Sequence, residues 1–364
     1  MAENVVHLNA LNSNLDSKKK YTCSIVGARG YTGLELARTL LNHPWVRLTT
    51  CFATSDFKLT DHLLEPAAEN VQCLSDSQIL NSLTDFVFLA TPAEVSLELA
   101  PKILKAGKHV IDLSGAFRLK KNDYKKWYNF EHTEPEALAQ AVYGLVPWSG
   151  PVQLNKPTLI SNPGCYATAI SMALLPLLKR GLIDPTTLVI DAKSGTSGAG
   201  KKATENLLFT EVDGECLPYK VGRHQHLPEI IEALEMFSQN KYKLDPHFTT
   251  HLLPTRRGII AGIYATAKTS DIKQIERAYA EEYFSYPLVK FGLANQTQQQ
   301  LTSLKKVVGT ARTHISFELV GTKLYVFSLI DNLVKGAAGQ AVENLNRLLD
   351  APVETGLMLQ KGIL

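Results

Sequence analysis

Apolar runs and amphipathic stretches alternate along the first half of the chain, between residues 21 and 160. Residues 31–43 and 95–106 carry apolar side chains at helical spacing, and Pro44 and Gly107 follow them as helix stops. Four apolar runs around these helices are typical of buried strands: Thr22–Val26, Arg47–Ala53, Phe86–Ala90 and His109–Leu113. Strands and helices in this alternation predict a parallel sheet with right-handed crossovers.

The pattern changes near residue 160. A short strand over 158–161 leads into a helix that begins at Cys165, and two further helices are predicted over 270–284 and 334–349. Runs of strand type follow the first of these helices: Leu188–Ala192, Thr249–Leu253, Ile259–Ala267, His314–Val320 and Lys323–Ile330. The longer runs alternate, which predicts a second sheet with one packed face and one more open face.

We therefore predict an α/β fold with two parts. One has a doubly wound parallel sheet of the Rossmann type, and the other is an α+β domain built on the second sheet. The expected division is a flexible N-terminal arm at 1–20, a first domain at 21–160, a second domain at 161–330, and a C-terminal helix at 331–364 that returns to the first domain. The positive charge of the arm lies at its end, which is the reverse of the order in a secretory signal.

Composition and charge narrow the class of protein. Of the 364 residues, 45% are hydrophobic and 20% are charged, which is typical of a globular chain and excludes disorder as its main state. A formal net charge of +3 is too small to indicate a nucleic-acid or anionic-membrane partner, and no apolar run approaches the ~18–20 residues that span a bilayer. The five cysteines are scattered without a CxxC pair, so we expect no metal site, no disulfide framework and a cytoplasmic location.

A glycine-rich segment joins the first predicted strand to the first predicted helix. Its spacing, G-x-x-G-x-x-G over residues 27–33, is a variant of the dinucleotide fingerprint. Glycine permits the tight turn and lets backbone N–H groups approach a pyrophosphate, while the helix N-terminus adds partial positive charge. The alternative is an ordinary glycine-bearing turn. We predict that the cofactor contacts come from Gly27, Arg29, Gly30, Tyr31, Thr32 and Gly33.

The end of the second strand bears on the choice between NAD and NADP. NAD sites usually have an acidic residue there, which holds the ribose hydroxyls. Here Thr54 and Ser55 come first, Asp56 follows, and Lys58 is close behind. The hydroxyls and the lysine suit a 2′-phosphate, whereas Asp56 would repel one if it pointed inward. We predict NADP (NADPH) as the cofactor.

Cys165 is the candidate nucleophile. Pro163 and Gly164 force a sharp turn that places it in the first turn of the following helix. A thiol there faces unpaired backbone N–H groups and the positive helix end, so we expect its pKa to lie below the free value of about 8.5. The same N–H groups could serve as an oxyanion hole. The alternative is a buried, inert cysteine.

A thiol nucleophile needs a base, and two histidines stand close together at His224 and His226. If the segment is extended, the i, i+2 spacing puts both rings on one side. Such a pair could bind a metal, but no third ligand stands nearby. We favour one histidine that acts on Cys165, with Arg223 binding an anion.

A rival motif occupies residues 195–202, which nearly match the phosphate-binding P-loop. The final position is Lys202, so the hydroxyl that would hold magnesium is missing. We interpret this segment as a glycine-rich loop that covers a substrate or a nicotinamide, and keep a P-loop kinase or NTPase as the alternative.

Six motifs in order together resemble the N-acetyl-gamma-glutamyl-phosphate reductases of arginine biosynthesis, from about residue 21 to the C-terminus. They are G-A-R-G-Y-T-G at 27–33, D-L-S-G-A-F-R at 112–118, S-N-P-G-C-Y-A-T-A at 161–169, S-G-T-S-G-A-G-K at 194–201, H-Q-H-L-P-E-I at 224–230 and D-N-L-V-K-G-A-A at 331–338. The resemblance implies a semialdehyde dehydrogenase-like fold. In such a fold residues 21–160 would be the dinucleotide-binding domain, and residues 161–330 would be an α+β catalytic and oligomerisation domain with a large mixed sheet. The family usually has arginine where Gln225 stands, and Arg223 or Lys220 are the candidates to compensate.

The resemblance also implies residue roles. Cys165 would be the nucleophile and His226 the acid/base, with Ser114, Arg118 and His224 near the substrate. Asn332 and the loop at Ser194-Gly195 would lie by the nicotinamide. We also assign Thr91 and Pro92 to the cofactor site and Asn162 to the substrate site. Anionic groups of the substrate could be held by Arg118, Arg223 or Lys201.

The expected function is NADPH-dependent reduction of N-acetyl-L-glutamyl 5-phosphate to N-acetyl-L-glutamate 5-semialdehyde through a cysteine thioester, with release of phosphate. The partners would be this small molecule and further copies of the chain, as a dimer or tetramer. Two alternatives stay open. One is an aspartate-semialdehyde dehydrogenase, and the other is a non-catalytic NADPH-binding regulator.

Overall fold

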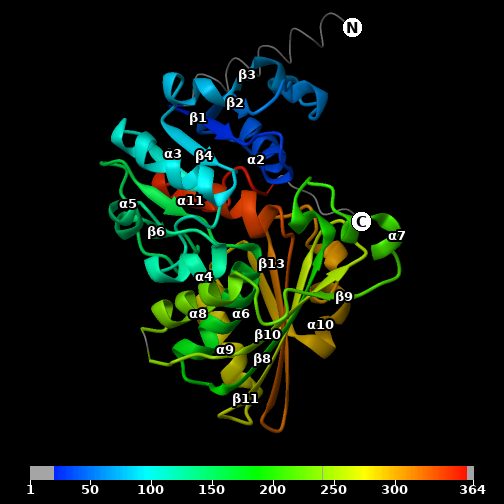
Figure 1. Cartoon of the computed structure of the whole chain (residues 1–364). Helices are drawn as coiled ribbons and strands as arrows, with labels where there is room; N and C mark the ends of the chain where they lie inside the picture. Colours follow the sequence, from blue (N-terminus) through cyan, green and yellow to red (C-terminus); the bar gives the residue numbers. More distant parts are fainter. Residues whose placement is uncertain (1–19, 240, 359–364) are drawn as a thin grey trace, which may run out of the picture.

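The computed structural model describes residues 20–239 and 241–358, and within them the chain forms two seven-stranded sheets (Figure 1). The predicted N-terminal arm, except for Lys20, lies outside the described residues. The first sheet has the order β3-β2-β1-β4-β5-β7-β6, and every pairing in it is parallel. Its strands are β1 Tyr21–Val26, β2 Val46–Ala53, β3 Gln72–Ser75, β4 Phe86–Leu89, β5 His109–Asp112, β6 Val142–Tyr143 and β7 Leu159–Ser161. The predicted Rossmann-type sheet is thus confirmed.

The order of this sheet reverses between β1 and β4, and such a switch point is where open α/β sheets bind ligands. The helix after β1 is α2, and its apolar face packs on β1 and β2. The other helices of this part are α3, which follows β4, and two short ones. Their bounds are α2 Tyr31–Leu41, α3 Ala93–Lys105, α4 Tyr124–Tyr128 and α5 Pro135–Gln140.

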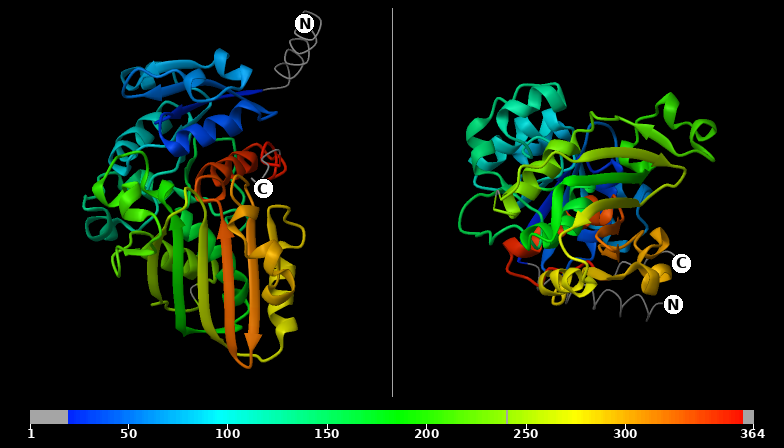
Figure 2. Two further views of the ribbon diagram at one scale, coloured as in Figure 1. Left: turned by 90° about the vertical axis from the view of Figure 1, so that its right-hand side faces the viewer. Right: turned by 90° about the horizontal axis from the view of Figure 1, so that it is seen from below.

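The second sheet is mixed and has the order β12-β13-β14-β11-β8-β10-β9. β8 and β12 pair in parallel with β10 and β13, and the other pairings are antiparallel. Its strands are β8 Ile183–Gly195, β9 Leu217–Tyr219, β10 His247–Leu253, β11 Ile259–Ala267, β12 Val289–Leu293, β13 Thr313–Val320 and β14 Lys323–Ile330. Figure 2 shows the long strands of this sheet side by side below the first sheet.

Helix α6 is the centre of the core between these strands and the remaining helices. It contacts β8, β11, β13 and β14 on one side and α8 and α9 on the other, and all but its two end residues are buried. A helix that is apolar nearly all round is stable only when it is enclosed in this way. The helices of this part are α6 Cys165–Lys179, α7 Phe209–Val212, α8 His226–Phe237, α9 Ile272–Tyr283, α10 Ala294–Leu301 and α11 Gly339–Leu348.

The C-terminal segment leaves β14 and packs on α2 of the first sheet. The sequence predicts one helix over 334–349, but the structure begins with a π-helical turn, η8, at Val334–Ala338, before α11. The buried carboxylate of Asp331 accepts the backbone N–H groups of Leu333 and Val334 at 2.7 and 3.0 Å. This cap, together with Gly336 N bonding back to Asp331 O at 2.9 Å, holds the wider turn.

Short 3₁₀ turns complete the described chain: η1 Leu59–Asp61, η2 Pro66–Asn70, η3 Asp76–Asn81, η4 Lys121–Asp123, η5 Thr196–Ala199, η6 Glu205–Leu207 and η7 Leu304–Lys306. Among the described residues, no helix has the length and the apolar character that crossing a membrane requires.

Candidate active site

The turn that carries Cys165 joins β7 to α6, as the sequence predicts. Gly164 caps α6 in an extended conformation, so Cys165 is the first helical residue. The preceding Asn162 is buried and fixed on two sides: its N–H donates to Asp112 O at 2.8 Å, and its Nδ2 donates to Ala337 O at 3.2 Å. Cys165 therefore follows a turn that the parallel sheet and the C-terminal segment both hold.

Two close approaches define the walls around Cys165. A Cβ built on Gly164 would lie 2.5 Å from Nε2 of His226, so the imidazole packs directly on the turn. A Cβ built on Gly336 in η8 would lie 2.6 Å from the Cβ of Cys165. Glycine at these two positions is what lets α8 and η8 approach Cys165 and its turn so closely.

The two histidines do not lie on an extended segment. His226 is the first residue of α8, and its backbone N–H donates to Nδ1 of His224 at 3.2 Å. Their rings still meet edge to face, with centroids 4.8 Å apart. They share an aromatic cluster with Tyr166, Tyr219 and Phe248. Among the described residues, no group of three or more His, Cys, Asp or Glu side chains could hold a metal ion.

Burial sets the protonation of this site. It lowers the pKa of His226 to about 3, so this imidazole is neutral at pH 7. Burial also raises the pKa of the Cys165 thiol to about 11, and the nearby Arg118 only partly opposes it. The expectation of a pKa below the free value is therefore wrong, because desolvation outweighs the helix N-terminus. The free protein holds a thiol beside a neutral imidazole, which suits proton transfer to His226 as the sulfur attacks.

Glu229 is a buried residue of this site that the sequence did not single out. Its Oε1 accepts the N–H of Gly164 at 2.7 Å and the hydroxyl of Tyr143 at 2.8 Å, and its Oε2 lies 3.5 Å from Nη1 of Arg118. The sequence could have indicated Glu229 only through its position three residues after His226, because this spacing on α8 puts both side chains on one helix face.

The other residues predicted to bind substrate lie in different environments. Ser114 is buried, and its hydroxyl donates to Asp112 Oδ2 at 2.9 Å. Arg223 is exposed at the surface. Lys220 donates to Oε1 of Gln225 at 2.7 Å, so a cation does reach the position where the family usually has arginine. The structure thus packs His226 on the Cys165 turn, and the ring of His224 contacts that of His226. Arg118 is hydrogen-bonded to Asn162 O on the same turn, whereas Arg223 is exposed.

The glycine turn fits an anionic dinucleotide. Gly27 has a φ of 81°, and a Cβ there would lie 2.4 Å from Ala90 O. A Cβ on Gly33 would lie 2.4 Å from Gly27 O, so the turn closes only with glycine at both places. Within the described residues no side chain caps α2 and its first turn has no acidic residue, which leaves the positive helix end to a ligand.

Polar groups surround this turn. Nη1 of Arg29 donates to Oγ of Ser55 at 2.6 Å, so a cation lies beside the hydroxyls at the end of β2. Thr54 and Ser55 are both exposed. In the next turn Pro92 caps α3, and Oγ1 of Thr91 lies 2.8 Å from Oγ of Ser96.

The loop after β8 faces the glycine turn across a cavity of about 470 Å³, whose lining includes Tyr31, Ser197 and Lys201. Nζ of Lys201 lies 5.4 Å from the ring centre of Tyr31. At the end of β8 the buried Ser194 donates through its hydroxyl to Gly195 O at 3.1 Å. A 3₁₀ turn, η5, follows β8, whereas a P-loop leads into an α-helix, so the P-loop interpretation fails on local structure.

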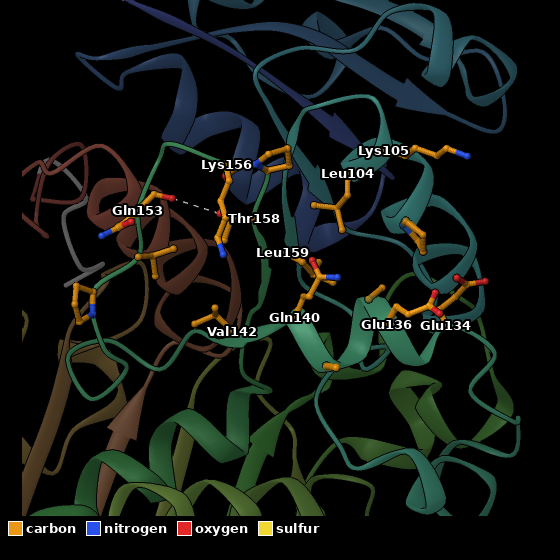
Figure 3. Close-up of a pocket in the computed structure, with 16 residues that line it drawn as sticks. Leu104, Lys105, Glu134, Glu136, Gln140, Val142, Gln153, Lys156, Thr158 and Leu159 are labelled. Carbon is orange, nitrogen blue, oxygen red and sulfur yellow. Dashed lines mark hydrogen bonds between the residues drawn. The ribbon is translucent and has the colours of Figure 1, made fainter.

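Asn332 connects this loop to a neighbouring turn. Its Nδ2 donates to Oγ of Ser197 at 3.0 Å, and its Oδ1 accepts the N–H of Gly258 at 2.8 Å. A cavity of about 880 Å³ lies elsewhere, at the end of β7 away from Cys165, where Leu104 and Lys105 of α3 meet Thr158 (Figure 3). Of the predicted site residues, Tyr31 and Lys201 line the smaller cavity, and none lines the larger one.

Comparison with known proteins adds two domain matches. Residues 22–155 match the family described as semialdehyde dehydrogenase, NAD binding domain. Residues 165–332 match the family described as semialdehyde dehydrogenase, dimerisation domain.

Curated relatives match over nearly the full length. The N-acetyl-gamma-glutamyl-phosphate reductase of Streptococcus gordonii is 39% identical over 93% of this chain and 98% of the relative. The protein of the same name from Bacillus cereus is 38% identical over 92% and 97%.

Solved structures of lower identity share the fold. Aspartate semialdehyde dehydrogenase II of Vibrio cholerae, complexed with ASA, superposes with a TM-score of 0.67 at 16% identity, over 91% of this chain and 99% of that one. Aspartate semialdehyde dehydrogenase of Candida albicans, solved with NADP, gives a TM-score of 0.62 at 15% identity, over 91% and 99%.

Proposed function

This chain belongs to the N-acetyl-gamma-glutamyl-phosphate reductase family, and we propose from that premise that it reduces N-acetyl-L-glutamyl 5-phosphate to N-acetyl-L-glutamate 5-semialdehyde in arginine biosynthesis. The electron donor is NADPH, and inorganic phosphate is released. The observation that carries the proposal is the placement of Cys165 at the start of a buried helix, with the imidazole of His226 packed on the preceding residue.

The chemistry begins with the thiol. Sγ of Cys165 attacks the carbonyl carbon of the acyl phosphate, a C–S bond forms, and the C–O bond to phosphate breaks. The thiol proton passes to the neutral imidazole of His226 and from there to the departing phosphate oxygen. Bound NADPH supplies the hydride that reduces the resulting thioester. His226 then delivers a proton taken up from solvent to the sulfur as the C–S bond breaks, which restores the thiol and frees the aldehyde.

The residues around the glycine turn suit the cofactor. The backbone at Gly27, Gly30 and Gly33 would hold the pyrophosphate, because the turn has room for backbone only at Gly27 and Gly33. Arg29 with the hydroxyls of Thr54 and Ser55 would bind the 2′-phosphate, since a guanidinium and two hydroxyls offer donors only a few ångströms apart. The remaining cofactor positions we propose are Tyr31, Thr32, Thr91, Pro92, Ser194, Gly195 and Asn332.

Substrate anions need cations close to Cys165. We assign Arg223, Lys201 and the neighbouring Lys220 to this role, with Ser114 and His224 lining the site. Arg223 and Lys201 are exposed, so both are free to turn toward a bound ligand.

We divide the chain into a dinucleotide-binding domain at 21–160, a catalytic domain at 161–330, and a C-terminal segment that packs back on the first domain. The match of 165–332 to a dimerisation domain indicates a homo-oligomer. The face of the second sheet with Val189, Tyr264, Tyr325 and Phe327 is the surface on which we place the dimer contact. Val189, Tyr264 and Tyr325 lie in cross-strand register, the ring of Phe327 contacts that of Tyr264, and Val189 is 39% exposed. Sedimentation of wild type and Tyr264→Glu tests this placement.

We also place the protein in the reducing cytoplasm, because its five cysteines form no disulfide bond with one another. This agrees with a pathway enzyme whose nucleophile must stay reduced.

The test is turnover in the reverse direction, with N-acetylglutamate semialdehyde, phosphate and NADP⁺ as substrates. The rate is measured as the formation of NADPH. Cys165→Ser should lose at least ~10³-fold in kcat, whereas Cys216→Ser, at an exposed cysteine, should retain wild-type activity. Preferred turnover of aspartate semialdehyde would favour the related dehydrogenase activity. Unchanged activity in Cys165→Ser would overturn the mechanism.

A further inference from the structure

Arg118 and Glu229 form a buried ion pair beneath the turn that carries Cys165. Nη1 of Arg118 lies 3.5 Å from Oε2 of Glu229, and the two side chains are 7% and 0% exposed. Arg118 follows β5, whereas Glu229 belongs to α8, so the pair joins two elements that are far apart in sequence. Burying two charges costs desolvation free energy, so a pair this deeply buried is expected to have a structural or functional role.

Both members bind the backbone of the turn, one on each side of Pro163. Nε of Arg118 donates to Asn162 O at 2.8 Å, and Oε1 of Glu229 accepts the N–H of Gly164 at 2.7 Å. Nη2 of Arg118 also donates to Leu113 O at 2.7 Å, which ties the pair to the end of β5. The ion pair therefore clamps the two residues that fix the direction of Cys165.

We propose that Arg118 is a positioning residue for the nucleophile and not a ligand of the substrate: with Glu229 it holds the 162–164 turn and presents its positive charge to the Cys165 sulfur. A guanidinium that binds a phosphate or carboxylate offers two parallel N–H groups on an open edge. Here Nε and Nη2 donate to two backbone carbonyls, and Nη1 faces Glu229. The inference rests on the proposed function only in taking Cys165 as the nucleophile.

The charges around the sulfur agree with this role. Arg118 lowers the pKa of the Cys165 thiol and Glu229 raises it, against the larger effect of burial. Apart from Glu229, the titratable groups of α8 and α6 at this site are uncharged at pH 7: burial holds the pKa of His226 low and that of Tyr166 high. Burial raises the pKa of Tyr219 to about 12 as well.

From η8, Gly336 packs against the Cβ of Cys165, and the adjacent Lys335 is paired with Glu343 at 2.7 Å. Arg118 is therefore the cation that acts on the thiol in the described part of the chain.

The experiment compares two variants of the full-length protein without substrate. Glu229→Gln keeps an oxygen acceptor for Gly164 and removes the negative charge, and the double variant Arg118→Met/Glu229→Gln removes both charges together. The readout is the pH midpoint of iodoacetamide labelling at Cys165, measured by peptide mass spectrometry. Labelling of the exposed Cys216 in the same sample is the internal reference. Arg277→Met, at an exposed arginine of α9, is the matched control.

We expect Glu229→Gln to lower the midpoint at Cys165 by about one pH unit and the double variant to raise it again by at least as much. Equal midpoints in the two variants would overturn the proposal. Arg118→Lys provides a second readout, because lysine keeps the charge but cannot span both carbonyls. Positioning predicts at least a tenfold lower kcat with KM for the semialdehyde within about twofold of wild type.

A substrate-binding arginine would instead raise KM and leave kcat and the labelling midpoint unchanged, and that outcome in Arg118→Lys also refutes the proposal. Failure of the proposed function would be seen separately, as absence of turnover in wild type, while the labelling comparison stays valid.

Discussion

Substitution of Gly164 by alanine isolates the contact between the nucleophile turn and His226. The backbone at Gly164 has φ −69° and ψ 153°, a conformation that alanine adopts without strain. The added Cβ would lie 2.5 Å from Nε2 of His226, whereas ordinary contact begins at 3.4 Å. The imidazole must therefore retreat by about 0.9 Å, and a misplacement of about 1 Å can cost 10²-fold in rate.

We expect Gly164→Ala to fold, with about 1–3 kcal/mol lower stability from overpacking, and to lose about 10²-fold in kcat. The assay is steady-state turnover of the semialdehyde, with urea unfolding to measure stability. Gly150→Ala is the control, because nothing in the described structure lies within 4 Å of a Cβ at that position. A folded Gly164→Ala enzyme with wild-type kcat would refute the assignment of His226 as the proton carrier.

Three further predictions follow from charges in the structure. Burial lowers the pKa of His224 and His226 well below the value in the unfolded chain. Below about pH 6.5 the unfolded chain therefore binds more protons than the folded protein does. The free energy of unfolding, measured with urea, should fall by about 1 kcal/mol per histidine for each pH unit of acidification. Stability that is flat between pH 7 and 5 would contradict it. Arg29→Met should raise KM for NADPH at least about tenfold and leave KM for NADH nearly unchanged; equal effects would argue against a 2′-phosphate contact. Arg257 of the second part lies 2.5 Å from Glu35 of α2 in the first part. A double-mutant cycle at these two residues, read by thermal unfolding, should give a coupling free energy of about 1 kcal/mol. A coupling free energy of zero would show that this ion pair does not stabilise the contact between the two parts.

Much of the architecture could be predicted because its signals are local. The parallel sheet could be predicted from the apolar runs of β1, β2, β4 and β5 and from the helix stops after α2 and α3. β3, β6 and β9 are four, two and three residues long, so they carry too little alternation to be recognised. The π-helical turn η8 was not predicted from the sequence either, because it depends on the cap by Asp331 and on the approach of Gly336 to Cys165.

The site could be predicted only in its residue types. Turn chemistry around Cys165 predicts a cysteine at the start of a helix, and the structure has it there. The pKa of that thiol depends on burial by α8 and η8, which no local pattern reveals, so the predicted direction was wrong. Glu229 lies 65 residues beyond the Gly164 N–H that it accepts, and sequence alone gives no sign of that contact.

The most direct test of the thioester mechanism is mass spectrometry of the enzyme mixed with N-acetylglutamyl phosphate in the absence of NADPH. The account predicts one N-acetylglutamyl group on the peptide that contains Cys165, released on addition of NADPH as the semialdehyde. An enzyme that turns over normally yet carries no acyl group at Cys165, or carries it at another residue, would contradict it.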